Sequence, residues 1–426
     1  MFDTIRKAWR VADLRKKMLY TFGMLILYRL VGVIPAPGVD AARDMSETTS
    51  LPLLELVNMM TGNAFSNMTI MARGITPYIN ASIIMQLLTI AIPALERMQE
   101  DEEGGGREKI ARITRYVTVG LAALQAIGLV AGLGYIKSGW LNYVLVGVSM
   151  AGGTALAMWI GERITDKGVG NGISLLIFVG IVSNLFNGII SGFTTAAAGG
   201  TTSGWINLLV IILVALIMTV AVTFVELGER RIPLQISKQV KGRRVYGGQS
   251  THMSLKVCMV GVLPLIFAYS FMALPSTIIQ LVDPRYEKGF TQWWMMNMGT
   301  TSWAYMLISA LLIIAFTFFY SSISFDPKKQ AEQLIMQGAV IPGQRGKNIA
   351  MYLSNIVGRL NLFSALYLAI LSAVPTMLTA RLRISVPFAA SSILIAVSVA
   401  LETLRTLQGE LSIRGIESSM DNGGFM

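Results

Sequence analysis

Residues 74–89 read GITPYINASIIMQLLT, and residues 261–268 read GVLPLIFA. Both segments fit the pattern G-[IV]-x-P-x-I-x-A, and a second proline follows each of them, Pro93 in one case and Pro275 in the other. Each segment belongs to a run of about 20 mostly apolar residues, the length that a helix needs to cross a bilayer. The pattern predicts two related transmembrane helices, although coincidence is the alternative because Gly, Pro, Ile and Ala are common in such helices.

The composition of the whole chain is that of a membrane protein. Hydrophobic residues make up 53% of the 426 residues, charged residues make up 14%, and the mean hydropathy is +0.59. A soluble domain carries about 25% charged residues. The single cysteine, Cys258, excludes a disulfide framework, and the single histidine, His252, excludes a multi-histidine metal site. We expect a polytopic membrane protein without a cofactor.

Apolar runs of sufficient length occur ten times along the chain. They predict spans at residues 18–34, 75–95, 113–134, 141–161, 171–191, 205–225, 257–281, 303–324, 360–379 and 386–404. The repeated proline segments then occupy spans 2 and 7, the same position in two sets of five. An odd number of helices per set reverses the direction of the second set, which is the arrangement of an inverted repeat. The predicted fold is an all-α polytopic membrane protein with ten transmembrane helices in two inverted halves.

The boundaries of these halves follow from the spans. The N-terminal half comprises residues 1–191, the C-terminal half comprises residues 205–405, and a tail occupies residues 406–426. Basic residues are concentrated before the first span and in the even-numbered connections. Since Lys and Arg stay on the cytoplasmic side, both termini are predicted to be cytoplasmic.

The spans lack the residues that energise transport. The acidic residues lie in loops, in tails or at the ends of spans, so no buried carboxylate is available to carry protons or sodium. Residues 338–343 have the glycine spacing of a phosphate loop, but Gln344 replaces its lysine. The chain is therefore predicted to be a passive conduit and not an enzyme. A secondary transporter for a small solute is the rival hypothesis.

Two long cytoplasmic connections, residues 226–256 and 325–359, carry closely spaced basic residues. Arg243 and Arg244 lie in the first, and Arg345 and Lys347 lie in the second. One reading is topology control combined with binding of anionic lipids. The other is docking of a large, partly anionic partner, because connections of this length are usually functional.

Further recognisable segments accompany GITPYINASIIMQLLT (74–89) along the chain. In order, they are VIPAPGVD (33–40), GREKIARITRY (106–116), ITDKGVGNGIS (164–174), ERRIPLQISKQVKGRRVYGGQSTH (229–252), FDPKKQAEQL (325–334) and VIPGQRGKN (340–348). Through these segments the chain resembles the SecY family, the channel subunits of the bacterial protein-export translocon. The resemblance runs from Leu14 to about Leu404. The resemblance implies a protein-conducting channel in the bacterial cytoplasmic membrane. Such a channel translocates unfolded preproteins and releases transmembrane segments laterally into the membrane.

The resemblance also implies roles for individual residues, with the two halves around a central pore. The aliphatic pore ring of the family falls on Ile75, Ile79, Ile173, Ile177, Ile266 and Ile395. The plug that closes the idle pore falls on residues 61–73, including Asn63, Phe65, Ile70 and Arg73. The lateral gate lies between spans 2–3 and 7–8, and its lining falls on Asn80 and Leu274. For Asn80, a bond to a neighbouring helix is the alternative.

The implied partners are the SecE and SecG subunits, the SecA motor ATPase, the ribosome and the signal peptides of preproteins. Arg243, Arg244, Arg345 and Lys347 lie on the loops that dock the motor or the ribosome.

Three positions depart from the family pattern. Arg73 stands where the family usually has an aliphatic residue, and we expect it to face the outer funnel because an unpaired arginine within the membrane is costly. Span 10 begins two residues short of the familiar pattern, which bears on the assignment of Ile395. Cys258 stands where asparagine is common, so a polar link across the gate is expected to be absent.

Overall fold

A computed structural model describes residues 2–39, 61–62, 64, 67–100, 105–132, 139–199, 202–236, 239–241, 244–246, 250–282, 289–298, 302–342, 348–382 and 390–413. Every predicted span overlaps a helix. These helices are α2 (Ala12–Val31), α4 (Thr76–Ala91), α6 (Gly106–Gly132), α7 (Trp140–Lys167), α8 (Gly172–Gly199), α9 (Thr202–Leu227), α10 (Leu263–Val282), α12 (Trp303–Ser324), α14 (Asn348–Leu382) and α15 (Ala390–Ile413). The shorter helices are α1 (Phe2–Arg10), α5 (Pro93–Glu100), α11 (Gly289–Asn297) and α13 (Pro327–Met336).

Length and apolar character identify the clearest membrane spans among these helices. Within the described residues, α7, α8, α9, α12 and α14 contain the 5 segments that are long and apolar enough to cross a bilayer. The bent pair α4 and α5 makes a sixth if it counts as one span. The arrangement is that of a polytopic helical membrane protein, and it is consistent with the predicted ten spans.

In two of the predicted spans, a proline or a glycine moves the boundary of the helix. Span 2 was predicted to reach residue 95, but α4 ends at Ala91 and the chain bends by 107° into α5. Pro93 causes this break because it lacks an N–H group and disfavours helical backbone at Ile92, which is extended. Span 7 was predicted to begin at residue 257, but α10 begins at Leu263. Gly261 precedes it in the left-handed region, with φ of 61°.

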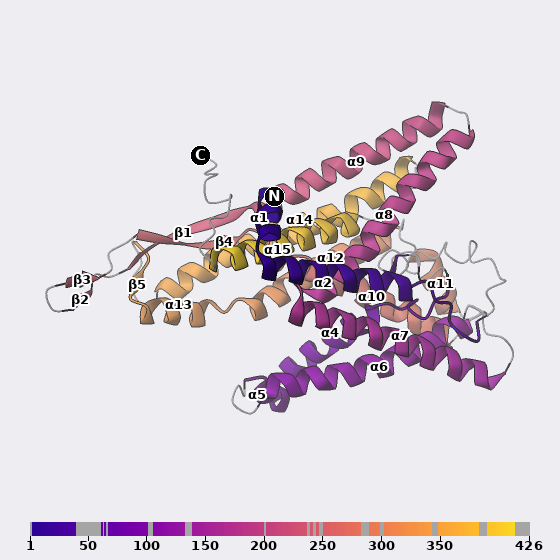
Figure 1. The fold of residues 1–426 in the computed structure, drawn as a ribbon, viewed down its shortest axis with the longest axis horizontal. Coiled ribbons are helices and arrows are strands. Elements are labelled where there is room, and N and C mark those ends of the chain that lie inside the picture. The colour runs from indigo at the N-terminus through magenta and orange to yellow at the C-terminus, as the bar shows by residue number, and fades with distance from the viewer. Residues whose placement is uncertain are drawn as a thin grey trace.

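The contacts between helices repeat in the two halves. In the first half, α4 contacts α6, α6 contacts α7, α7 contacts α8, and α2 contacts α8. In the second half, the helices at the same positions make the same contacts: α10 with α12, α12 with α14, α14 with α15, and α9 with α15. Figure 1 places α6 and α7 at one side of the molecule and α9 at the other. This equivalence supports the predicted repeat.

A small β-sheet was missed by the sequence analysis, which treated its segments as loops. Strands β1 (Glu229–Ile236), β4 (Ser250–Lys256) and β5 (Ala339–Val340) form an antiparallel sheet in the order β4-β1-β5. Strands β2 (Gln239–Lys241) and β3 (Arg244–Tyr246) pair beyond it, and Figure 1 shows this hairpin extending away from the helices.

Alternation of side chains along β1 explains where the sheet packs. Ile232 and Leu234 are buried against Leu353 of α14, while Arg231 and Gln235 are exposed. Because Gln235 pairs with Val340, the sheet joins the two long connections that were predicted to dock a partner. The connections therefore form one structural unit.

Candidate functional site

The six isoleucines predicted to form a ring belong to one hydrophobic cluster. Ile75, Ile79, Ile177 and Ile395 are buried members of this cluster, and Ile173 and Ile266 are partly buried and packed against it. They come from α8, α10, α15 and the beginning of α4, so the cluster joins both halves of the chain. The structure brings the predicted residues together; their role in a pore stays a prediction.

Local structure explains how these side chains reach the cluster. Ile75 and Ile79 are four residues apart, as are Ile173 and Ile177, so each pair projects from one helix face. Asn171 fixes the start of α8 because its Oδ1 atom accepts hydrogen bonds from the backbone N–H groups of Ile173 and Ser174 at 3.1 and 3.3 Å.

The described part of the predicted plug is packed against the same cluster. The N–H of Ala36 donates to the carbonyl of Met68, and the N–H of Ile70 donates to the carbonyl of Ile34, both at 3.0 Å. Ala64 and Met71 are buried members of the isoleucine cluster, and Ile70 packs against it. Asn63 and Phe65 lie outside the described residues.

Two further contacts hold this segment in place. The guanidinium of Arg29 in α2 donates to the carbonyl of Gly62 at 3.3 Å and to the carbonyl of Val179 in α8 at 2.5 Å. Gly153 of α7 allows a close approach, because a Cβ atom at this position would overlap the carbonyl oxygen of Ile70. The plug segment therefore contacts α2 and α7 of the N-terminal half.

Arg73 does not face an outer funnel, and the expectation from the sequence was wrong. Its side chain is 4% exposed, and its Nη2 atom donates to the Oε1 atom of Gln125 in α6 at 2.6 Å. Gln125 itself is 4% exposed. Sequence reasoning missed this glutamine, although a polar residue inside the apolar run 113–134 is a signal that could have found it.

Helix α10 forms the contact between the halves on the side predicted to be the gate. It packs against both α4 and α6. Asn80 of α4 is buried, and its Oδ1 atom has no hydrogen-bond partner within the described part of the chain. Leu274 lies on α10, but its side chain is outside the described residues, so the predicted pairing with Asn80 stays a prediction.

A cavity of about 220 Å³ adjoins the isoleucine cluster. Ile177, Ile266 and Ile395 line it on one side, and the charged residues Glu226, Lys256, Glu402 and Arg405 line it elsewhere. Ser398 donates to the Oε1 atom of Glu226 at 2.8 Å, and Arg405 donates to the carbonyl of Glu226 at 3.2 Å. Glu226, near the end of α9, is itself buried, so the expectation that no carboxylate is buried was wrong for this residue. The space next to the cluster thus changes from apolar to charged.

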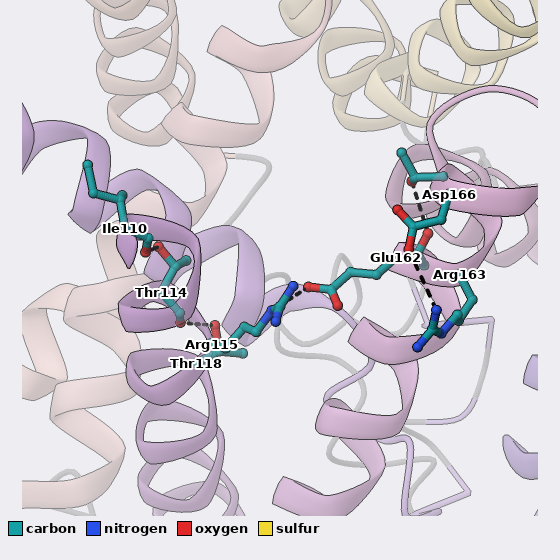
Figure 2. A network of polar contacts seen from close by, with 9 residues as sticks. Ile110, Thr114, Arg115, Thr118, Glu162, Arg163 and Asp166 are labelled. Carbon is teal, nitrogen blue, oxygen red and sulfur yellow. Dashed lines mark hydrogen bonds and ion pairs between the residues drawn. The ribbon is translucent and has the colours of Figure 1, made fainter. Parts of the chain in front are cut away.

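Polar contacts also join α6 to α7 at their predicted cytoplasmic ends (Figure 2). The Nε atom of Arg115 in α6 lies 2.7 Å from the Oε1 atom of Glu162 in α7. Within α7, the Nη1 atom of Arg163 lies 3.8 Å from the Oδ2 atom of Asp166, three residues further along. The hydroxyl of Thr114 bonds to the carbonyl of Ile110 in its own helix. The Arg115–Glu162 pair is partly exposed, so its contribution to stability is about 0–1 kcal/mol.

The predicted docking residues are mostly outside the described part of the chain. Arg243, Arg345 and Lys347 are not described, and Arg244 is described only as the first residue of β3. Among the described residues, no group of three or more His, Cys, Asp or Glu side chains is placed to hold a metal ion.

Comparison with protein families matches residues 69–404 to SecY. The chain belongs to the SecY family. SecY from Streptomyces scabiei, a protein translocase subunit, is 39% identical over 440 residues, covering 98% of this chain and 99% of the relative. SecY from Corynebacterium glutamicum is 38% identical, covering 96% and 98%. This SecY-family chain is a channel subunit of the cytoplasmic membrane and not an enzyme, and the transporter hypothesis has no support.

Solved structures share the SecY fold. The structure of a protein conducting channel superposes with a TM-score of 0.67 at 20% identity, covering 92% of both chains. Sec61 in the canine ribosome–channel complex superposes with a TM-score of 0.61 at 18% identity, again over 92% of both chains. The idle yeast Ssh1 complex on the 80S ribosome gives a TM-score of 0.64 at 13% identity, covering 96% of this chain and 92% of that one.

Proposed function

We propose that unfolded preproteins pass through the isoleucine cluster when the plug segment is displaced. The observation that carries this proposal is the meeting of six isoleucines from positions 75 to 395 in one cluster, with Ala64 and Met71 of the plug seated against it. An apolar constriction excludes water and therefore blocks ions. Aliphatic side chains form no specific bonds to a passing chain, so they suit many substrates.

The contact of α10 with α4 and α6 is proposed to be the lateral gate. These helices meet across the two halves, so their separation opens the cluster toward lipid. A signal peptide entering between them makes room for the preprotein behind it. The buried Oδ1 atom of Asn80, which has no hydrogen-bond partner among the described residues, gains water when the gate opens.

The two long connections are proposed to dock the partner that drives movement. Strand β1 pairs with β5, which places both connections in one unit. The sequences of the two connections contain Arg243, Arg244, Arg345 and Lys347, and this basic character suits the acidic surface of a motor or ribosomal RNA. The resemblance implies SecA and the ribosome for this role, with SecE and SecG as further subunits. The concentration of Lys and Arg on this side supports cytoplasmic termini.

A reconstitution experiment tests the proposed function. The channel complex, purified from native membranes, is placed in liposomes with a radiolabelled preprotein, the SecA motor and ATP. We expect the preprotein to become protected from external protease, and a preprotein without its signal peptide to stay exposed. Uptake of labelled small solutes without protection of the preprotein overturns the proposal in favour of a solute transporter.

A further inference from the structure

The plug segment contains a buried charge. Arg73 is 4% exposed, and its Nε atom has no hydrogen-bond partner within the described part of the chain. An arginine keeps its charge in a protein, so it cannot escape burial by losing a proton. Burying such a charge is unfavourable unless polar groups compensate it.

Gln125 supplies that compensation from a different element. Its Oε1 atom accepts from Nη2 of Arg73 at 2.6 Å, across 52 positions of sequence. Gln125 lies on α6, which contacts α4, α7 and α10. Helix α6 is therefore part of the contact between the two halves that we propose as the gate.

We propose that Gln125 is a positioning residue for the plug: it holds Arg73 in the closed seat, so that closure depends on where α6 lies. This inference rests on the proposed function, because it takes the segment at residues 61–73 as the plug. When α6 moves with the gate, the Gln125 acceptor moves away from Arg73 while the guanidinium is still in an apolar site. The charged side chain is then more stable in a hydrated position, so the plug segment moves out of its closed position.

The mechanism predicts an asymmetry between two substitutions. Removing one partner of a buried polar pair leaves the other without a bond, whereas replacing both with apolar groups is nearly neutral. Gln125→Leu therefore leaves the buried Arg73 without its acceptor, as opening of the gate does. The double variant Arg73→Leu/Gln125→Leu has no buried charge in the plug segment, so its plug returns to the closed position.

Idle ion conductance of the reconstituted complex is the first measurement. Gln125→Leu is expected to raise it about tenfold or more, since a stranded charged group shifts an equilibrium by at least a decade. The double variant is expected to return to within about twofold of the unchanged channel. Thr118→Val is the matched control, because its buried hydroxyl bonds only to the carbonyl of Thr114 in the same helix among the described contacts.

Position 71 supplies a second measurement that does not depend on conductance. Met71 is 1% exposed, so Met71→Cys in a Cys258→Ser background is expected to resist a membrane-impermeant maleimide. Adding Gln125→Leu is expected to make it reactive, and adding Arg73→Leu as well is expected to restore protection. If Gln125→Leu prevents assembly of the complex, Gln125→Glu takes its place. It keeps the acceptor and adds an opposite charge, so it is expected to slow the start of translocation while leaving idle conductance low.

Three outcomes overturn the inference: unchanged conductance and protection in Gln125→Leu, a double variant that leaks as much as the single one, or unaltered translocation in Gln125→Glu. Ile79→Asn serves as the reference for the pore itself. If Ile79→Asn raises the idle conductance and Gln125→Leu does not, the proposed role of Gln125 is wrong and the proposed pore is retained. If Ile79→Asn also leaves the conductance unchanged and no preprotein is translocated, the proposed function itself is wrong.

Discussion

Ser398 of α15 donates a hydrogen bond of 2.8 Å to the carboxylate of Glu226, which lies near the end of α9 and 172 positions away in sequence. Ile395 precedes Ser398 by three residues and therefore projects from the same face of α15. The bond fixes the rotation of the helix that carries Ile395 into the isoleucine cluster. Polar contacts at the end of α9 thus set the position of a residue in the proposed ring.

Ser398→Ala removes this donor, and we expect a less stable complex. A hydrogen bond to a charged group contributes about 1.5–3 kcal/mol, and Glu226 is only 8% exposed, so water replaces the lost donor poorly. The midpoint of thermal unfolding in detergent measures the effect. Thr403→Val is the matched control, because that hydroxyl bonds to the carbonyl of Val399 within α15. Equal shifts for the two variants would contradict a role for the Ser398–Glu226 bond.

Ile79→Asn is expected to hydrate the cluster and to raise the idle conductance of the channel. Burial of one such side chain contributes about 1.5–3 kcal/mol. The equilibrium constant between the closed and open states therefore shifts toward the open state by roughly one or two powers of ten. Single-channel recording measures this, and export of preproteins with defective signal peptides is expected to rise with it. Ile90→Asn, the same change at a 50% exposed position of α4, is expected to leave conductance low. Equal conductance in both variants would place Ile79 outside the pore.

Arg345→Glu is expected to abolish motor-driven export while leaving membrane insertion and folding of the channel intact. A guanidinium bonds bidentately to carboxylates, and reversal of its charge turns attraction into repulsion. ATP-dependent export of a preprotein in vesicles measures the effect. Arg112→Glu, an exposed position on α6 outside the two connections, is the control and is expected to export normally. Normal export by Arg345→Glu would remove this residue from the docking surface.

A cysteine pair at positions 80 and 274 tests the gate. Asn80→Cys and Leu274→Cys, made in a Cys258→Ser background, are expected to crosslink and to block export, with export restored by reduction. A disulfide needs Cα atoms within about 7 Å, so a short bifunctional crosslinker covers a slightly larger separation. The control combines Asn80→Cys with Ile370→Cys, which is 61% exposed on α14. Efficient crosslinking at 80 and 274 without loss of export would move the gate away from α4 and α10.

The boundaries of the helices show how much of the fold can be predicted from local sequence. The apolar runs predicted where helices lie, because length and apolarity are properties of a continuous segment. The predicted end of span 2 at residue 95 was wrong, since Pro93 ends α4 earlier. The pairing of β1 with β5 was missed because the two strands lie more than a hundred positions apart, and pairing at that distance leaves little trace in either strand alone.

Sequence by itself determined the membrane-spanning character of the chain and its family motifs, which follow from composition and from segments that can be recognised one at a time. The resemblance carried by those motifs pointed to six isoleucines whose role in a ring stays a prediction. Tertiary structure alone decided that Ile395 lies in the same cluster as Ile75, and that Arg73 is buried against Gln125 instead of facing a funnel. The physical reason is that a buried charge is tolerated only where a partner is in reach, and that partner is chosen by the packing of α6 against α4 and not by neighbours in sequence.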